Sequence, residues 1–360
     1  MAIAAVRVRP PLWVHSPMID LRSDTITKPS LGMLKAITSA EVGDDVFSED
    51  PTISRLEEML ADRFGMEAGL FCPSGTMTNQ IAVMTHTKPG DEVICEFNCH
   101  VNFYEQGGMA RNAGVSVNPI FGNRGVFTAS DLKAKLRPID EHFPKTKLVL
   151  AENTCNRGGG KVFPYPLLKE IRAVCDENNL KFHLDGARLY NAIVATSNSE
   201  NDFGRIFDSI SICLSKGLGC PVGSVLLGTY SFIDEARRAR KVLGGGMRQA
   251  GVLAAAGIYA VENNIDRLTV DNKWAAEVGK ILEQLSFVES ILAPETNILI
   301  FKVIEDLSAE QVVNQLAKEG ICCFAVGENK IRFVFHLDIS NEQFNDLKEV
   351  LKQFEPVQNV

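Results

Sequence analysis

Two segments give the clearest indication of the fold: His-Leu-Asp-Gly-Ala-Arg at positions 183–188 and Ser-Ile-Cys-Leu-Ser-Lys-Gly-Leu-Gly at positions 211–219. In both, a short apolar run ends on polar or charged residues. Runs of this kind, separated by helical stretches, predict buried parallel strands that are joined by crossover helices. Ligands of an open α/β sheet bind outside the carboxyl ends of its strands. We therefore expect Asp185 and Lys216 to lie at one such edge.

The same alternation extends outward from these two segments. An apolar run at 148–151 precedes a helical pattern at 166–178, and further strands are expected at 181–184 and 209–214. The run at 223–227 follows Lys216 too closely for a helical crossover, so it is expected to be antiparallel to its predecessor. The apolar stretch around 251–261 is rich in Ala and Gly and predicts a buried helix.

The pattern changes near residue 264. An amphipathic helix at 264–285 is followed by predicted strands at 297–303 and 330–335 and by helices at 308–318 and 340–354. These elements predict a smaller α+β domain at 264–360, after a large domain at 18–263. Residues 1–17 carry two arginines and several prolines, and Met18 follows them. We interpret this segment as a disordered extension, or as the result of a start codon assigned too early, in preference to a transit peptide.

Composition excludes several classes of protein. The chain has 360 residues and a net charge of −8, without long runs of either sign, so it lacks the basic face that nucleic-acid binding requires. No apolar run approaches the roughly 20 residues of a membrane span. The nine cysteines form no Cys-x-x-Cys pair and favour reduced, buried thiols over disulfides or a zinc site. A cytoplasmic metabolic protein without a metal is expected.

A third segment completes a chemical pattern. Phe-Cys-Pro-Ser-Gly-Thr at 71–76 precedes a helical stretch at 77–86. A lysine amine such as that of Lys216 can form a Schiff base with an aldehyde cofactor, and an acid such as Asp185 can keep a pyridine nitrogen protonated. The turn formed by Ser74, Gly75 and Thr76 offers N–H groups for a phosphate at a helix N-terminus. Each residue alone has an ordinary structural explanation, but the combination predicts a site for pyridoxal 5'-phosphate (PLP).

Five motifs in this order resemble those of the low-specificity L-threonine aldolases. They are Asp-Leu-Arg-Ser-Asp-Thr at 20–25, Val-Gly-Asp-Asp-Val at 42–46, His-Leu-Asp-Gly-Ala-Arg-Leu at 183–189, Leu-Ser-Lys-Gly-Leu-Gly-Cys-Pro-Val-Gly-Ser at 214–224 and Gly-Gly-Gly-Met-Arg-Gln at 244–249. The resemblance runs from about residue 18 to the C-terminus. It implies the aspartate-aminotransferase-like fold type I, with a mostly parallel sheet flanked by helices in the PLP-binding domain. It also implies cleavage of L-threonine, L-allo-threonine and related β-hydroxy amino acids to glycine and an aldehyde.

The resemblance also implies roles for individual residues around the cofactor. Lys216 would form the Schiff base with PLP, and Asp185 would bond the pyridine nitrogen. Arg188 would lie beside the cofactor oxygen and the substrate carboxylate. Gly75 and Thr76 match the phosphate loop, and His100 matches a histidine that stacks on the cofactor ring.

For the substrate, Arg332 matches the arginine that binds the carboxylate, with help from Ser23. His142 matches a histidine thought to contact the β-hydroxyl, and it or a water that it orients would act as the base. Lys241 and Arg248 match basic residues that enter the site from a neighbouring subunit. The resemblance therefore implies a homodimer with shared active sites, paired into a tetramer.

Two positions depart from the pattern of many relatives. Cys155 stands where they have histidine, and Phe47 stands where they often have tyrosine. The preferred side chain, the erythro or threo preference and the physiological direction stay open for this reason. His86 and His336 lack a family match and are interpreted as structural. His183 shares a strand face with Asp185, which leaves a supporting contact open.

Two other readings stay open from the sequence. The chain could be another β-eliminating PLP lyase or a phenylserine-type aldolase, which an assay of glycine and aldehyde against pyruvate and ammonia would separate. It could also be a PLP-binding protein without turnover. The set of Lys216, Asp185, Arg188, His100 and Arg332 argues against this last reading.

Overall fold

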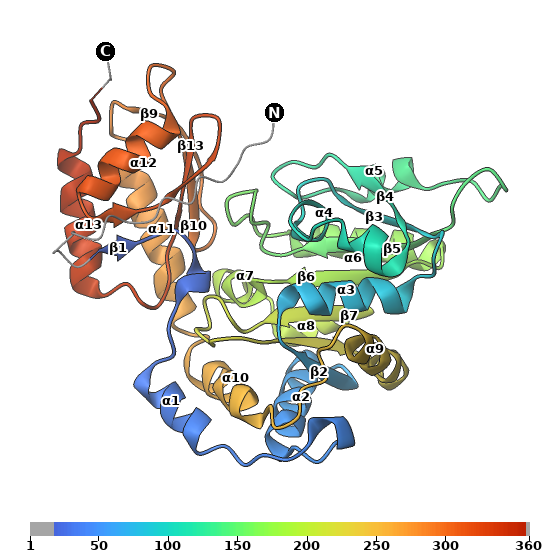
Figure 1. Ribbon diagram of the computed structural model, residues 1–360. Coiled ribbons are helices and arrows are strands. Elements are labelled where there is room, and N and C mark those ends of the chain that lie inside the picture. Colours follow the sequence, from blue (N-terminus) through green and yellow to red (C-terminus); the bar gives the residue numbers. More distant parts are fainter. Residues whose placement is uncertain (1–17, 358–360) are drawn as a thin grey trace.

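The computed structural model describes residues 18–357, and its central feature is a seven-stranded sheet in the order β2-β8-β7-β6-β5-β3-β4 (Figure 1). The strands are β2 (Ala68–Cys72), β3 (Glu92–Glu96), β4 (Ser116–Ile120), β5 (Thr146–Glu152), β6 (Lys181–Gly186), β7 (Ser209–Cys213) and β8 (Ser224–Gly228). Only β8 runs antiparallel to both of its neighbours. The predicted mostly parallel sheet and the antiparallel strand after Lys216 are both confirmed.

Helices cover both faces of this sheet because alternate strand residues point to opposite sides. On β2, Leu70 and Cys72 pack against α3 and α9, whereas Phe71 belongs to the core on the other face, with α2, α6 and α10. The helices of this part are α1 (Leu31–Thr38), α2 (Pro51–Phe64), α3 (Gly75–His86), α4 (His100–Phe103), α5 (Ala129–Lys135), α6 (Tyr165–Glu177), α7 (Leu189–Ala195), α8 (Glu200–Gly204), α9 (Tyr230–Val242) and α10 (Gly251–Asn263). The sheet is thus enclosed on both faces, and its strand ends are left free for a site.

The C-terminal part is built on a second, antiparallel sheet in the order β12-β13-β10-β9. Its elements are α11 (Leu268–Leu282), β9 (Val288–Leu292), β10 (Ile298–Val303), α12 (Ala309–Lys318), β11 (Ile321–Cys322), β12 (Phe324–Gly327), β13 (Lys330–Val334) and α13 (Asn341–Gln353). The prediction of one helix over 264–285 is wrong at both ends. The chain turns between α10 and α11, where the Asn264 side chain donates to the carbonyl of Leu218 at 2.8 Å.

The first described strand belongs with this C-terminal part. β1 (Ile19–Asp20) pairs in parallel with β11, and Ile19 and Leu21 are buried in the same core as Trp274 and Phe333. In Figure 1 the dark blue β1 accordingly lies beside the orange helices. The start of the predicted large domain therefore packs with the small one, and the boundary at 264 stays a prediction. The interpretation of residues 1–17 falls outside the described residues.

The cysteines and the helices agree with what the composition predicts about disulfides and membrane spans. All nine cysteines are buried, and none is paired with another in a disulfide. Within residues 18–357, no helix is both long enough and apolar enough to cross a bilayer.

Candidate active site

One edge of the central sheet gathers the predicted site residues. β2, β3, β5, β6 and β7 all run in the same direction, so their carboxyl ends lie at the same edge. Ser74, His100, Glu152, Asp185 and Lys216 lie at or just after these strand ends. The sheet topology thus brings together residues that are distant in sequence, as expected for a ligand site of an open α/β fold.

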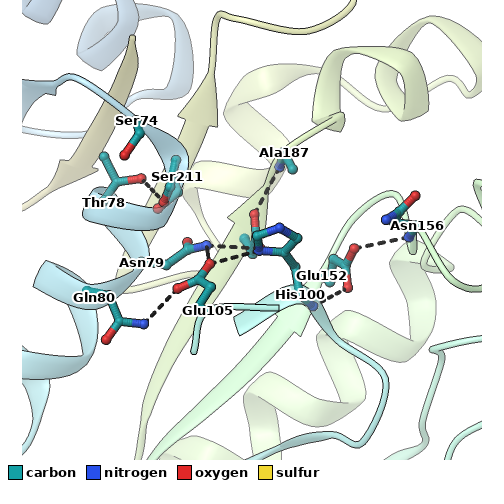
Figure 2. A network of polar contacts seen from close by, with 12 residues as sticks. Ser74, Thr78, Asn79, Gln80, His100, Glu105, Glu152, Asn156, Ala187 and Ser211 are labelled. Carbon is teal, nitrogen blue, oxygen red and sulfur yellow. Dashed lines mark hydrogen bonds and ion pairs between the residues drawn. The ribbon is translucent and has the colours of Figure 1, made fainter. Parts of the chain in front are cut away.

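Asp185 is held as a buried hydrogen-bond acceptor at the end of β6. Its exposed fraction is 3%. Its Oδ1 accepts from the backbone N–H of Ala187 at 3.2 Å, and its Oδ2 accepts from the side-chain amide of Asn79 at 3.0 Å (Figure 2). Both bonds come from neutral donors. The carboxylate is therefore fixed in place without a cationic partner of its own.

His100 opens α4 and is oriented by Glu105. Its Nδ1 lies 2.9 Å from Oε1 of Glu105, whose side chain is fully buried. Burial lowers the pKa of His100, but the bond to Glu105 and the negative charges of Glu105 and Asp185 outweigh this effect. The net pKa of His100 is raised, although the charge of Lys216 opposes the shift. Figure 2 shows this imidazole next to Glu105.

The N-terminus of α3 follows the end of β2 closely. Ser74 caps the helix, and its Oγ accepts from the N–H of Met77 at 3.2 Å. The N–H groups of Gly75 and Thr76 have no acceptor within the described part of the chain. A Cβ added at Gly75 would make ordinary van der Waals contact with Cys213, at 3.8 Å, and would clash with nothing. Free N–H groups at a helix N-terminus bind phosphate well.

Lys216 lies in a turn that is bonded to the segment just before α3. The turn follows β7, and the N–H of Gly223 donates to the carbonyl of Pro73 at 3.1 Å. The carbonyl of Lys216 accepts from Thr27 Oγ1 at 3.1 Å and from the N–H of Gly219 at 2.8 Å. Its ammonium forms no ion pair within residues 18–357. The backbone around Lys216 is therefore fixed, whereas its amine is available.

Two arginines approach the site from different elements. Arg188 follows β6 and binds the buried carboxylate of Asp24 through two bonds of 2.7 Å. Arg332 lies on β13 and, within residues 18–357, has only neutral acceptors, the side chain of Asn156 and the carbonyl of Arg22, each at 3.0 Å. Its Nε is buried without a partner. Burial and the nearby charge of Arg188 lower the pKa of Arg332 to about 10, against the opposing charge of Asp24.

Ser23 lies near the backbone that holds Arg332. It is the N-cap of the short helix η1 (Asp24–Ile26), and its Oγ accepts from Thr25 N and Thr25 Oγ1 at 3.2 and 2.8 Å. The same short segment supplies Asp24 to Arg188. The segment between β1 and α1 thus contributes to both arginine environments.

Three predicted residues are not brought to this edge within one chain. His142 lies in an exposed loop before β5, and its Nδ1 bonds Asp140 at 2.5 Å. Lys241 is exposed at the end of α9, and Arg248 is paired with Asp44 at 2.8 Å. All three lie at the surface of the chain. Their predicted roles therefore depend on a neighbouring subunit or on a rearrangement of the chain.

The two departures from the family pattern lie in different surroundings. Cys155 is buried, and its Sγ donates to the carbonyl of Glu152 at 3.1 Å. Burial raises the pKa of Cys155 well above its ordinary value. Phe47 is 69% exposed and lies 5.8 Å from the guanidinium of Arg248. Cys155 is thus an inert packed thiol, whereas Phe47 is part of the surface.

Sequence reasoning missed four buried residues of this site. Asp24 binds Arg188, Asn79 binds Asp185, Glu105 binds His100, and Glu152 accepts from the N–H of His100 at 3.0 Å. Burial, followed by the charge of Asp185, raises the pKa of Glu152. Asp24 lies inside a quoted motif and could have been noticed there. Glu152 directly follows the apolar run at 148–151 and could also have been noticed, whereas Asn79 and Glu105 carry no local pattern that separates them from ordinary polar residues.

The residues present fit PLP. A fixed buried carboxylate suits a protonated pyridine nitrogen, free N–H groups at a helix end suit a phosphate, and an unpaired lysine suits the aldehyde. His100, Glu105 and Asp185 also bring three ligand atoms within 4.8 Å of one another. However, each of these three is already engaged in hydrogen bonds of the site.

Comparison with solved structures agrees with the fold. A threonine aldolase from Leishmania major has a TM-score of 0.80 at 21% identity, with 93% of this chain and 99% of that chain covered. A serine palmitoyltransferase from Sphingomonas wittichii has a TM-score of 0.72 at 16% identity, with coverages of 93% and 86%. At these identities the likeness concerns the fold alone. The architecture is that of fold-type I PLP enzymes, as predicted.

Sequence comparison is more specific. Residues 20–306 match the beta-eliminating lyase family, a class of PLP-dependent enzymes. A low specificity L-threonine aldolase from Escherichia coli K12 is 41% identical over 92% of this chain and 97% of its own length. Low-specificity L-threonine aldolase 1 from Arabidopsis thaliana is 40% identical over 89% of this chain and 92% of its own. The chain belongs to the low-specificity L-threonine aldolases of the beta-eliminating lyase family, which confirms the resemblance.

Proposed function

We propose that this chain uses PLP to cleave L-threonine, L-allo-threonine and related β-hydroxy-α-amino acids to glycine and an aldehyde. The relatives named above are called low-specificity L-threonine aldolases. The observation that carries the proposal is the pairing of an available amine at Lys216 with a fixed, buried carboxylate at Asp185 on adjacent strand ends. An amine and an acid in this arrangement serve to hold an aldehyde cofactor and to keep its ring protonated.

Four groups would hold the cofactor. Lys216 would bind its aldehyde carbon as a Schiff base, and Asp185 would accept from its pyridine N–H. The N–H groups of Gly75 and Thr76 would bind its phosphate beside Ser74, and His100 would pack on its ring. When bound, PLP supplies an electron sink for the pair of electrons that remains on Cα after the Cα–Cβ bond breaks.

Arg332 would bind the substrate carboxylate. Its guanidinium faces only neutral acceptors and has one buried N–H without a partner, so an entering carboxylate would supply the missing anion. Ser23 would assist from the adjacent segment. Arg188 already uses Nε and Nη2 on Asp24, so its share in substrate binding would depend on Nη1. A fixed carboxylate orients the bond that breaks.

His142, or a water that it orients, would take the β-hydroxyl proton. Loss of such a proton-transfer group lowers the rate by about 10²- to 10⁴-fold. Because His142 is exposed on its own chain, this proposal requires that it reach the site of a neighbouring subunit or that its loop rearrange. The variant His142→Asn should reduce kcat within that range, and a fully active variant would remove His142 from the mechanism.

A homodimer with shared active sites, paired into a tetramer, would bring Lys241 and Arg248 to the cofactor of a neighbour. Phe47, beside Arg248, and Val242, next to Lys241, are exposed by 69% and 79%, which favours a covered surface near these two basic residues. Sedimentation would give the size of the assembly. Mixing Lys216→Ala with Arg248→Ala subunits should restore activity through hybrid sites, and no recovery after subunit exchange would contradict shared sites.

One experiment tests the function directly. The purified protein should show a visible cofactor band and should release aldehyde and glycine from L-threonine, L-allo-threonine and phenylserine. Release of pyruvate and ammonia instead would favour another β-eliminating lyase. Borohydride reduction and peptide mapping should place the trapped cofactor on Lys216. Asp185→Ala should bind PLP weakly and turn over almost no substrate, whereas normal absorbance and turnover would reject the assignment.

A further inference from the structure

A continuous chain of buried hydrogen bonds runs behind Asp185. Asp185 Oδ2 bonds the Asn79 amide at 3.0 Å, and Asn79 Oδ1 lies 3.3 Å from Nε2 of His183. His183 Nδ1 lies 2.8 Å from Ser209 Oγ, which in turn lies 2.7 Å from Nε2 of His86. Asn79, His183, Ser209 and Asp185 are at most 3% exposed. Over most of its length, this series of hydrogen bonds is therefore shielded from water.

Complementarity fixes the protons of this chain. The Asn79 amide nitrogen donates to Asp185, so its oxygen accepts, and Nε2 of His183, which also lies 3.4 Å from Ser211 Oγ, is the donor. Nδ1 of His183 then accepts from the Ser209 hydroxyl, and the Ser209 oxygen accepts from Nε2–H of His86. Burial lowers the pKa of His183 to about 3 and the pKa of His86 to about 4. Both rings are neutral at neutral pH, and every donor points toward Asp185.

The amide of Asn79 also serves a second carboxylate. Its nitrogen donates to Oε1 of Glu105 at 3.0 Å as well as to Asp185. Glu105 also accepts from Gln80 at 2.6 Å and contacts Nδ1 of His100 at 2.9 Å. Figure 2 shows Asn79 and Gln80, on adjacent positions of α3, both directed at Glu105. Since one ligand atom each of His100, Glu105 and Asp185 lies within 4.8 Å of the others, the two carboxylates are close neighbours.

We propose that Asn79 is a positioning residue for the reaction, whose amide holds the carboxylates of Asp185 and Glu105 side by side while His183 fixes the orientation of that amide. Two nearby carboxylates repel each other, and hydrogen-bond donors placed between them offset this repulsion. A neutral amide supplies both donors and has no proton to transfer. Asn79 thus acts on the ring nitrogen through Asp185 and on the stacking histidine through Glu105. The inference rests on the proposed role of Asp185.

The affinities of the protein for PLP and for an analogue without the ring nitrogen test this role. Asn79→Leu retains approximate side-chain volume but removes both donors, and hydrogen bonds to charged groups of this kind change affinity on the order of 10- to 100-fold. The dissociation constant of PLP from the apoprotein should rise by that factor. The dissociation constant of the 1-deaza analogue, which lacks the ring nitrogen, should change by less than about threefold, since Asp185 has no N–H to accept from it. Equal losses for both cofactors would mean a structural role and would overturn the proposal.

Gln80→Leu is the matched control. It removes a bond to Glu105 from the next position of α3 but leaves the bond from Asn79 to Asp185 in place. Its two dissociation constants should not separate PLP from the deaza analogue. Asn79→Ser supplies a single hydroxyl donor and should recover part of the preference for PLP. No difference between Asn79→Leu and Gln80→Leu would reject a special role for Asn79.

Two further measurements distinguish a failure of the proposed role of Asp185 from a failure of the role inferred for Asn79. If wild type and Asp185→Ala bind both cofactors alike, the proposed role of Asp185 fails; if they differ and Asn79→Leu does not, only the present inference fails. In wild-type protein with ¹⁵N-labelled histidine, His183 should show the neutral Nε2–H tautomer without titration between pH 5 and 9. A titrating ring or the Nδ1–H tautomer would overturn the proposed orientation of Asn79, even if the variants do not fold.

Discussion

The two arginines near the site differ in what surrounds them. Arg188, at the end of β6, and its partner Asp24 have side chains only 5% and 0% exposed, and they form a bidentate ion pair. Arg332, on β13 of the C-terminal sheet, contacts only neutral oxygens and has a buried Nε without a partner. The same residue type is thus neutralised in one part of the molecule and left unneutralised in the other.

This difference distinguishes an arginine that contributes to the stability of the fold from one that is available to bind an anion. A buried ion pair strongly destabilises a fold when one partner is removed, because the remaining charge is left uncompensated. A cation without an anionic partner contributes little to folding but binds an entering anion. We therefore expect Arg188 with Asp24 to matter for the folded chain and Arg332 to matter for the substrate. Substitutions at either arginine environment test these two roles.

The largest effect is expected from Asp24→Ala. The variant leaves the Arg188 guanidinium buried and unpaired, which lowers the free energy of unfolding by about 3–5 kcal/mol. Urea unfolding of the apoprotein would measure it. The control is Asp20→Ala, whose partner Arg22 is 27% exposed. That control should lose at most about 1 kcal/mol. Equal losses in the two variants would remove the contrast.

Arg332→Met comes next. It should lower kcat/KM for L-threonine by about 100-fold, since a charge-assisted bidentate contact is lost, while the free energy of unfolding is unchanged or raised. Steady-state kinetics and urea unfolding on the same preparation test both statements. The matched control is Lys330→Met, an exposed cation on the same strand. A variant of Arg332 that loses stability but keeps its KM would assign Arg332 to the structure instead.

The pH dependence should distinguish the two arginines further. The pKa of Arg332 is lowered to about 10, whereas the charge of Asp24 outweighs burial and raises the pKa of Arg188. Arg332 therefore loses its proton as pH rises through about 10, and its affinity for a carboxylate should fall about tenfold per pH unit above that value. Inhibition by 3-hydroxybutyrate, which has no amine to titrate, measures this affinity. A constant inhibition constant up to pH 11 would contradict it.

The lowered pKa of Arg332 has the opposite effect on folding from the raised pKa of a cation in a stabilising ion pair. A cation with a folded pKa below its unfolded value opposes folding while it is protonated. Stability attributable to Arg332 should therefore rise, not fall, as pH passes through its folded pKa. Arg332→Met should not show this rise, and unfolding curves of both proteins on either side of pH 10 would check it.

The smallest effect is expected from Asn156→Ala. The Asn156 side chain accepts from Nη1 of Arg332 at 3.0 Å and so orients the guanidinium without touching the partner of Arg188. Loss of this bond should raise KM by about 3- to 10-fold and leave kcat nearly unchanged. Kinetics at several substrate concentrations would resolve the two constants. A fall in kcat alone would show that Asn156 does more than hold Arg332.

Much of the fold was accessible from the sequence because the apolar runs are short, regular and bounded by polar residues. The strand predicted at 181–184, which extends to Gly186 as β6, and the antiparallel strand after Lys216 follow from local pattern and link length. The break between α10 and α11 was predicted, but the start of α11 was placed four residues too early. The turn there depends on a contact between Asn264 and Leu218 that no local pattern contains.

The site divides in a similar way. Strand-end residues such as Asp185 and Lys216 are recognisable because their chemistry stands out after an apolar run. Asn79 and Glu105 are ordinary polar residues of a helix and a loop in sequence, and only packing places them next to Asp185 and His100. His142 shows the converse, since a motif singled it out but one chain leaves it at the surface.

The sequence by itself determined the alternation of strands and helices at 148–227, the residue types able to hold the cofactor and the family, because these depend on local periodicity and on motifs. The tertiary structure alone decided which buried charges are neutralised, since Asp24 and Arg188 are 164 residues apart and meet only in the folded chain. It also decided how Asp185 is held, because hydrogen bonds and burial depend on proximity in space.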